Sequence, residues 1–290
     1  MPRDIDLKRD DGRTVCVRIA GANNGPLVIY MHGSPSSRLD IDYLDARSAR
    51  RGVRLAAFDR PGYGGSTLHR FDFASVAADA AAVADHLGAP TFAVMGQSSG
   101  AGYAVGTAAY LPDRVSAMAT GGSDGPIEPG TKTWALLSEP EQRGVLLAGT
   151  DDQEAERLLA EADRPYVERQ LAIDDAGLLA YWRAAAGIAD RRALDDGFDA
   201  VLVPTLRESL RQGQAGWARD NVVRMPQWEI DTGAVRCPAT FWLGEQDAGN
   251  PEGGQWLATL VPHGEVRLLP DYGHFVIFEV WDDVLDSLGV

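Results

Sequence analysis

Short apolar segments alternate with helical segments along the first part of the chain, and this alternation limits the folds open to it. Leu27–Met31, Val53–Phe58, Thr91–Met95 and Val115–Thr120 are short, apolar and bounded by turn-forming residues, which predicts strands. Between them, Phe73–Leu87 carries apolar residues at helical spacing. Alternating strands and helices indicate parallel βαβ units, and uniformly apolar strands indicate helices on both faces. The sequence therefore predicts an α/β fold with a mostly parallel sheet.

The middle of the chain has a different pattern. From residue 125 to residue 232, helical segments follow one another without a convincing strand. Strand patterns return at Thr240–Leu243 and Val266–Leu269, before a last helix near the C-terminus. We therefore expect a core domain formed by residues 1–124 and 233–290, with residues 125–232 inserted as a helical cap.

Composition narrows the range of partners. The chain has 290 residues, and its formal net charge is −15 at pH 7, which disfavours nucleic acid and anionic membrane surfaces as partners. The N-terminus lacks an apolar signal region, and no apolar run is long enough to cross a membrane. Cys16 and Cys237 are far apart in sequence and show no metal-binding spacing. We expect a cytoplasmic protein that acts on a small molecule without a cofactor or metal.

One motif carries most of the chemical information. Gly96-Gln97-Ser98-Ser99-Gly100 is a G-x-S-x-G sequence that lies between a predicted strand and a predicted helix. In this context the sharp turn needs small flanking residues and exposes the serine at the strand end. A rival interpretation is a dinucleotide-binding glycine loop, but several strands precede this segment, and neither lysine of the chain has a tyrosine four residues before it. The sequence therefore favours Ser98 as a nucleophile.

A serine nucleophile needs a base, and the base needs an acid to orient it. His274 follows a late strand, so it can reach a serine at the carboxyl edge of the sheet. We expect solvated or structural roles for His69, His86 and His263. Asp247 follows the strand Thr240–Leu243 and is the favoured acid, with Asp124 as the alternative. The order serine, aspartate, histidine is the one expected when G-x-S-x-G is a nucleophile turn.

The same chemistry requires two backbone N–H donors for the negative charge that develops on the substrate oxygen. Ser99 follows the nucleophile, and its N–H would supply one donor. The loop after Leu27–Met31 would supply the other through Ser34, because Gly33 allows the backbone to turn there.

Four segments together resemble the α/β-hydrolase superfamily, and they occur in that family's order. They are His32-Gly33-Ser34-Pro35, the loop Asp59–Ser66, Gly96–Gly100, and Asp247 together with Gly273-His274-Phe275. The resemblance covers nearly the whole chain. It implies an eight-stranded, mostly parallel sheet with helices on both faces, and a helical cap inserted after the sixth strand.

The resemblance also allows this chain to be compared with particular enzyme classes of the superfamily. Epoxide hydrolases and haloalkane dehalogenases have an aspartate as nucleophile, so Ser98 argues against both. Proline iminopeptidases are similar in cap placement but usually have glycine where this chain has Ser34 and tryptophan where it has Ser99. These two departures weaken the prediction of an aminopeptidase.

The sequence thus predicts a carboxylesterase-like serine hydrolase that cleaves small to medium, partly apolar esters. Gly33, Trp134, Trp182 and Trp217 are candidates for the substrate pocket, although aromatic residues of a cap also pack against the core. Two alternatives stay open. One is an amidase or aminopeptidase with the same triad, and the other is a ligand receptor or biosynthetic protein that does not hydrolyse.

Overall fold

The computed structural model describes residues 1–123, 125–248 and 251–290. Within these residues, eight strands form one sheet in the order β1-β2-β4-β3-β5-β6-β7-β8. The pairs β1–β2 and β2–β4 are antiparallel. Every pair from β4 to β8 across the sheet is parallel. This arrangement confirms the predicted α/β fold and its mostly parallel sheet.

The strands follow the apolar segments of the sequence closely. Every residue of the strands β3, β5 and β7 is buried, as expected for parallel strands that helices cover on both faces. The strands are β1 (Arg3–Lys8), β2 (Thr14–Gly21), β3 (Leu27–Met31), β4 (Arg54–Phe58), β5 (Phe92–Gln97), β6 (Val115–Gly121), β7 (Ala239–Gly244) and β8 (Gly264–Leu269).

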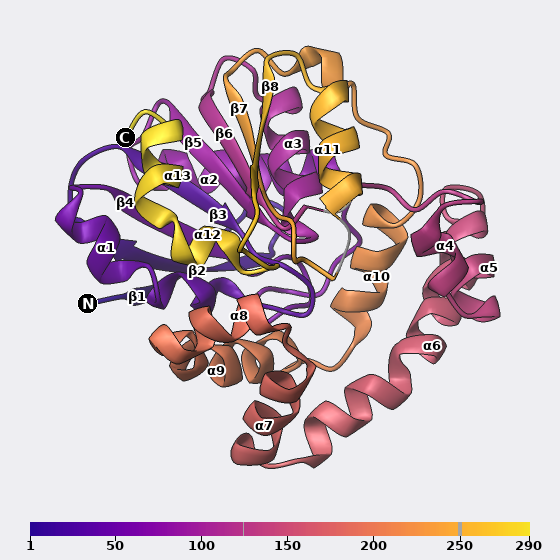
Figure 1. The fold of residues 1–290 in the computed structure, drawn as a ribbon. Coiled ribbons are helices and arrows are strands. Elements are labelled where there is room, and N and C mark those ends of the chain that lie inside the picture. The colour runs from indigo at the N-terminus through magenta and orange to yellow at the C-terminus, as the bar shows by residue number, and fades with distance from the viewer. Residues whose placement is uncertain (124, 249–250) are drawn as a thin grey trace.

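Helices of the core lie on both faces of this sheet (Figure 1). One face packs against α2 (Phe73–His86), α3 (Gly100–Tyr110) and α11 (Pro251–Leu260). The other face packs against α1 (Asp45–Arg50), α12 (Val276–Glu279) and α13 (Trp281–Ser287), with the short turn η1 (Arg38–Asp42) at its edge. Two apolar layers therefore enclose the sheet.

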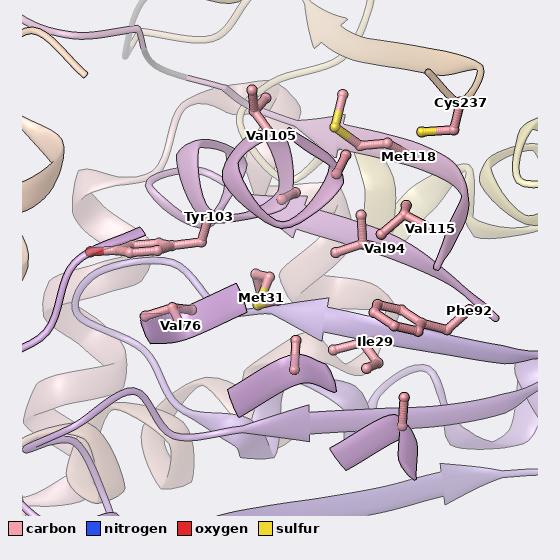
Figure 2. Close-up of a cluster of buried hydrophobic side chains, with 14 of the residues drawn as sticks. Ile29, Met31, Val76, Phe92, Val94, Tyr103, Val105, Val115, Met118 and Cys237 are labelled. Atoms are coloured by element: carbon pink, nitrogen blue, oxygen red, sulfur yellow. The ribbon is translucent and has the colours of Figure 1, made fainter. Parts of the chain in front are cut away.

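Figure 2 shows part of the first layer, in which strand residues meet helix residues. Ile29, Met31 and Val94 of the sheet pack with Val76 of α2 and Tyr103 of α3. All five are completely or almost completely removed from solvent. This packing fixes α3 against β5, and the turn between these two elements carries Ser98.

The segment between β6 and β7 is helical, and we call residues 125–232 the cap segment. Its helices are α4 (Lys132–Leu136), α5 (Glu139–Leu147), α6 (Asp152–Ala172), α7 (Asp175–Ala185), α8 (Ile188–Ala193), η2 (Leu194–Phe198), α9 (Asp199–Ser209) and α10 (Ala215–Arg224). Figure 1 shows α8 and α9 close to α12 and the edge of the sheet, while α4, α5 and α6 lie farther out. A short turn, η3 (Thr232–Ala234), leads back to the core.

Some boundaries differ from the sequence prediction. The predicted strand Val53–Phe58 begins one residue later, at Arg54, and the turn η1 before α1 was not predicted. Helix α6 begins after Asp151, whose side chain accepts a hydrogen bond from the N–H of Glu154. Asp151 therefore caps the first turn of this helix.

Among the described residues, no helix is both long and apolar enough to cross a membrane. Both cysteines are buried and unpaired.

Candidate active site

The turn between β5 and α3 holds Ser98 in a constrained conformation. Its φ is 54°, in the left-handed region that non-glycine residues rarely adopt. The N–H of Ser98 donates to the carbonyl oxygen of Gly121 at 2.8 Å, which fixes the turn to β6. A Cβ on Gly96 would overlap the carbonyl of Gly100, and a Cβ on Gly100 would overlap that of Met31. The two flanking glycines are therefore required by close backbone approach, as the sequence motif predicts.

His274 and Asp247 meet at the same edge of the sheet. Nδ1 of His274 lies 2.9 Å from Oδ2 of Asp247. Asp247 follows β7, and His274 follows β8. The side chain of Asp247 is 5% exposed, whereas that of His274 is 27% exposed. Gln97, directly before Ser98, donates from Nε2 to the carbonyl oxygen of His274 at 2.9 Å. The loop with the imidazole is thus tied to the strand that presents the serine.

The loop of His274 is also held from the cap segment. Asp190 of α8 accepts a hydrogen bond from the N–H of Phe275 at 2.9 Å. Burial raises the pKa of the Asp190 carboxyl, and the Phe275 N–H and the charge of His274 oppose that rise. Core and cap segment therefore both determine the position of the imidazole.

Ser98 and His274 line one cavity of about 90 Å³ between the sheet edge and the cap segment. Most of its wall is apolar and comes from α7, η2, α9 and the α12 region. The lining residues are Gly33, Ser34, Pro35, Ser36, Asp40, Gln97, Ser98, Trp182, Phe198, Leu202, Thr205, Leu206, His274, Phe275 and Phe278. An engineered cavity of about 150 Å³ holds the six heavy atoms of benzene, so a volume of about 90 Å³ suits a group of about four heavy atoms.

Ser34 and Ser99 flank Ser98, as the sequence predicts for the two N–H donors. An added Cβ on Gly33 would lie 3.3 Å from the Cβ of Ser98, so the loop after β3 passes directly beside the nucleophile. Ser99 is the N-cap of α3, where backbone N–H groups lack partners within the helix. Within the described residues, no hydrogen bond uses the backbone N–H of Ser34 or of Ser99. Both donors are therefore available to a substrate oxygen.

The side chains of Ser34 and Ser99 belong to a buried polar network. The Ser99 hydroxyl donates to the Ser34 hydroxyl at 2.9 Å, and the Ser34 hydroxyl donates to Asp220 of α10. Asp220 also accepts from Arg60 Nη2 and from the Tyr63 hydroxyl, each at 2.7 Å. It accepts a further hydrogen bond from the hydroxyl of Tyr103. One carboxylate of the cap segment thus connects both predicted oxyanion residues to the core.

The Arg60–Asp220 pair is completely buried. Burial alone would raise the pKa of Asp220, but the positive charges of Arg60 and Arg224 and the hydrogen bonds from Arg60 and Ser34 outweigh burial and lower the pKa to about 2. The guanidinium of Arg60 also donates to the carbonyl oxygens of His32 and Gly33. The guanidinium of Arg60 therefore holds the loop after β3, and Asp220 is the counterion of this buried charge.

Replacement of Asp220 by asparagine is expected to lower the free energy of unfolding by about 3 kcal/mol, because it leaves the buried Arg60 charge without its counterion. Denaturant unfolding at neutral pH measures this change. This difference between wild type and variant should shrink as the pH falls through about 4 toward 2. The reason is that the pKa of Asp220 is lower in the folded chain than in the unfolded chain. Asp195→Asn is the control, because Asp195 pairs with Arg183 at the surface and should cost less than about 1 kcal/mol. Equal losses in both variants would contradict the expectation.

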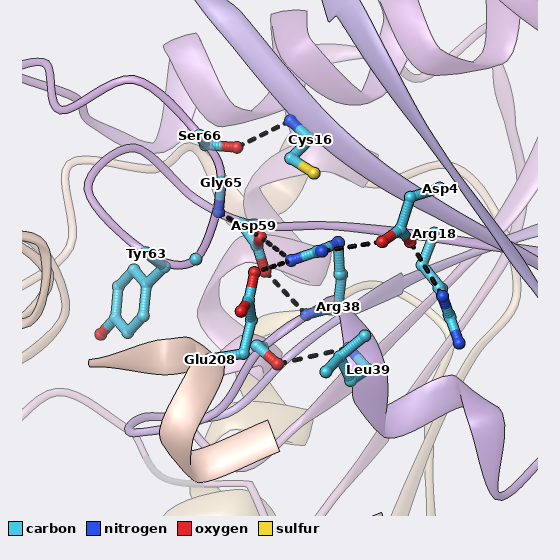
Figure 3. Close-up of polar contacts among 12 residues, drawn as sticks. Asp4, Cys16, Arg18, Arg38, Leu39, Asp59, Tyr63, Gly65, Ser66 and Glu208 are labelled. Carbon is cyan, nitrogen blue, oxygen red and sulfur yellow. Dashed lines mark hydrogen bonds and ion pairs between the residues drawn. The ribbon is translucent and has the colours of Figure 1, made fainter. Parts of the chain in front are cut away.

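A second ionic network fixes η1 beside this loop (Figure 3). Nη1 of Arg38 lies 2.5 Å from Asp59 and 2.6 Å from Glu208 of α9, and its Nη2 lies 2.9 Å from Asp4. Asp59 also accepts from the N–H of Gly65 at 3.0 Å. Arg38 therefore joins the N-terminal strand, the Asp59 loop and the cap segment.

Asp40 of η1 is a buried carboxyl that lines the cavity. Its Oδ2 accepts from the hydroxyl of Ser36 at 2.6 Å and from that of Tyr30 at 3.2 Å. Burial raises the pKa of Asp40 to about 6, although the hydroxyls of Ser36, Thr205 and Tyr30 oppose this rise.

The pKa of Asp40 predicts a pH dependence of stability. Between about pH 4 and pH 6 the folded chain retains a proton that the unfolded chain releases, so stability is lost as the pH rises. A pKa raised to about 6 corresponds to about 3 kcal/mol. In Asp40→Asn this loss should disappear, so the variant should gain stability relative to the wild type as the pH rises. Denaturant unfolding across this range measures the difference, and a pH-independent difference would contradict the assignment.

Two of the four predicted pocket residues line the cavity, and the other two pack elsewhere in the structure. Gly33 and Trp182 line the cavity with Ser98 and His274. Trp217 instead packs against Tyr63, Val167 and Leu210. Trp134 packs inside the cap segment, next to Val145, Leu159 and Met225. Aromatic residues of a cap cannot be divided between lining and packing without knowing which helix faces the site.

The alternative acid, Asp124, lies outside the described residues. A larger hollow of about 340 Å³ lies between the start of the cap segment and α11, and neither Ser98 nor His274 lines it. In the described parts of the chain, no three His, Cys, Asp or Glu side chains cluster in a way that could hold a metal ion.

Sequence analysis missed three polar residues near the nucleophile, namely Asp40, Arg60 and Asp220. Arg60 lies in the Asp59–Ser66 segment that carries the family resemblance, so this segment was a usable signal. Asp40 and Asp220 lie in segments without a recognisable motif. Their importance depends on burial and on partners that are distant in sequence.

The fold and this arrangement of side chains define a class of protein. The family model described as alpha/beta hydrolase fold matches residues 26–279, and the chain belongs to this family. Over 81 residues the chain is 40% identical to a non-heme haloperoxidase of Rhodococcus erythropolis, a match that covers 27% of this chain and 30% of that enzyme.

Solved structures with the same fold cover the whole chain. The enol-lactonase of Burkholderia xenovorans superposes with a TM-score of 0.66 and 18% identity, over 97% of this chain and 98% of that one. A thermophilic esterase of Thermogutta terrifontis gives a TM-score of 0.64 and 18% identity, over 100% and 97% of the two chains. The thioesterase domain of a curacin biosynthetic pathway gives a TM-score of 0.68 and 15% identity, over the full length of both chains. These similarities show a shared fold.

Proposed function

We propose that this member of the family is a serine hydrolase that cleaves small to medium, partly apolar esters through an acyl-enzyme. One observation carries the proposal. Ser98, held at a positive φ in the turn between β5 and α3, shares a cavity with His274, whose Nδ1 lies 2.9 Å from Asp247. Nucleophile, base and orienting acid in this order constitute the machinery of acyl transfer.

The proposed reaction uses each residue in a defined role. With Nδ1–H directed to Asp247, Nε2 of His274 accepts the proton of the Ser98 hydroxyl while the serine oxygen attacks the ester carbonyl. The N–H groups of Ser34 and Ser99 stabilise the negative charge that develops on the carbonyl oxygen. His274 then donates its proton to the leaving alcohol, and the acyl group remains on Ser98. Water activated by His274 releases the acid and restores the serine.

The small volume and the apolar lining of the cavity favour an ester with a short, partly apolar acyl group. Trp182, Phe198, Leu202 and Phe278 supply apolar surface beside Ser98. Burial of such a group supplies binding energy at about 25 cal/mol per Å² of apolar surface. The volume of about 90 Å³ favours acyl groups with about four heavy atoms beyond the carbonyl.

A covalent probe tests the proposal directly. A fluorophosphonate should label the wild type at Ser98, as peptide mass spectrometry would show, and the protein should hydrolyse p-nitrophenyl acetate and butyrate. Labelling should persist in Ser287→Ala, because Ser287 lies in the last helix and donates to the carbonyl of Val284. Labelling at another residue would remove Ser98 from the mechanism. Labelling of Ser98 without turnover of any ester or amino-acid amide would favour a receptor or a narrow biosynthetic role.

A further inference from the structure

The cavity contains a second polar centre besides the proposed catalytic residues. Ser36, Asp40 and Thr205 all line it. The Ser36 hydroxyl donates to Asp40 at 2.6 Å and lies 3.3 Å from the Thr205 hydroxyl. Thr205 makes its shorter hydrogen bonds with Ser37, at 2.7 Å to the hydroxyl and 3.0 Å to the N–H. The polar centre therefore joins the loop after β3 to helix α9 at the wall of the cavity.

Asp40 is the charged member of this centre, and it has no counterion. Only 3% of the residue is exposed. Arg38, two residues earlier, is ion-paired with Asp4, Asp59 and Glu208. Across residues 1–123, 125–248 and 251–290, no basic side chain forms an ion pair with Asp40, and its Oδ1 accepts no hydrogen bond. A buried carboxylate is normally paired, so this site lacks a cationic partner.

The mechanism proposed above uses neither Asp40 nor its neighbours, so the carboxyl needs another explanation. A structural role is served by Oδ2, which binds Tyr30 and Ser36. That role does not require a charge, because a neutral amide oxygen could accept the same two hydrogen bonds. The charge and the unpartnered oxygen at a cavity wall point instead to a ligand that brings a positive charge.

We infer that Asp40 is a specificity-determining residue that binds a protonated amino group on the acyl part of the substrate. The inference rests on the proposed hydrolase function and narrows its substrate class to short amino-acyl esters. The acyl group stays attached to Ser98 while the alcohol departs, so the cavity lined by Ser98 and Asp40 suits the acyl side. An ammonium there supplies the counterion that the carboxylate lacks and donates a hydrogen bond to Oδ1.

Three methyl esters of equal shape test this specificity in the wild type. They are methyl 3-aminobutanoate, methyl 3-hydroxybutanoate and methyl 3-methylbutanoate, and acid release is followed at about pH 7.5, where both Asp40 and the amine are mostly charged. The amino ester should have a kcat/KM at least about tenfold above that of the methyl isostere. Preference for the hydroxy ester, or equal rates for the amino and methyl esters, would overturn the inference. This comparison needs no variant.

Asp40→Asn should abolish the preference, so that the ratio of kcat/KM for methyl 3-aminobutanoate to kcat/KM for methyl 3-methylbutanoate falls to about one. Asp42→Asn is the matched control, because Asp42 is bonded to Arg18 outside the cavity and should keep the preference. A preference retained in Asp40→Asn would overturn the assignment to this carboxyl.

A binding measurement separates this inference from the proposed function. Calorimetry with butan-2-amine, which lacks the ester, should show binding to the wild type that is at least about tenfold weaker in Asp40→Asn. Butan-2-ol is the neutral comparison and should bind more weakly than the amine. If the fluorophosphonate fails to label Ser98 but the amine binds through Asp40, the hydrolase proposal fails while the amine site stands. If Ser98 is labelled and the amine does not bind, only the amine site fails.

Discussion

Replacement of Ser98 by alanine is expected to lower kcat for p-nitrophenyl butyrate by about 10⁶-fold. Alanine removes the attacking oxygen and leaves His274 with no proton to accept, so the proposed acyl-enzyme cannot form. The residual rate should come from the N–H groups of Ser34 and Ser99, which remain in place to stabilise charge. Initial rates at saturating ester measure the change, and circular dichroism verifies that the variant is folded.

Ser287→Ala is the control for this experiment, because Ser287 lies at the end of α13, away from the cavity, and its loss should leave kcat within about twofold. Retention of more than about one hundredth of the wild-type rate in Ser98→Ala would exclude Ser98 as the nucleophile.

Replacement of Asp247 by asparagine is expected to lower kcat by about 10⁴-fold while changing KM little. In the proposed mechanism, the carboxylate at 2.9 Å from Nδ1 holds the imidazole in the tautomer that leaves Nε2 free to accept a proton. An asparagine at this position can donate a hydrogen bond to Nδ1 and thereby favour the wrong tautomer. Steady-state kinetics with the same ester separate the effect on kcat from the effect on KM.

Asp271→Asn serves as the control, since Asp271 precedes His274 by three residues in the same loop and is exposed. Its rate should stay close to that of the wild type. The alternative acid predicts another result. If Asp124 orients His274, Asp247→Asn should remain active and Asp124→Asn should lose the rate.

The sequence predicted the fold because the core segments carry local signals. Leu27–Met31 and Phe92–Met95 are uniformly apolar and end at glycine-containing turns, and both lie in fully buried parallel strands. The turn at Ser98 was also predictable, because Gly96 and Gly100 are required by backbone contacts within a few residues and with the neighbouring strand. The proposed positions of His274 and Asp247 could be inferred because the carboxyl ends of parallel strands meet at one edge.

The surroundings of these residues could not be predicted in the same way. Asp220 contacts Ser34, Arg60 and Tyr103, which are more than 100 positions away in the sequence. Asp40 depends on the apolar surroundings that raise its pKa, and no local pattern specifies those. The wall formed by Phe198 and Leu202 likewise depends on how the cap segment packs on the sheet edge. Such features arise from tertiary contacts, whereas the turn at Ser98 arises from short-range geometry.

The unequal attachment of the cap segment has a consequence for how a substrate enters. Helix α10 is anchored by the buried Asp220, and α9 is anchored by Glu208 and Thr205, so moving either helix breaks ionic or hydrogen bonds beneath the cavity. Helix α7 buries only Leu178, yet it carries Trp182 at the cavity wall. Weakly buried helices open at a lower free energy than the rest of a fold. The ion pairs that α7 forms through Asp175 and Arg183 are partly exposed, so we expect ligand exchange to depend more on fluctuations of α7 than on those of α9 or α10.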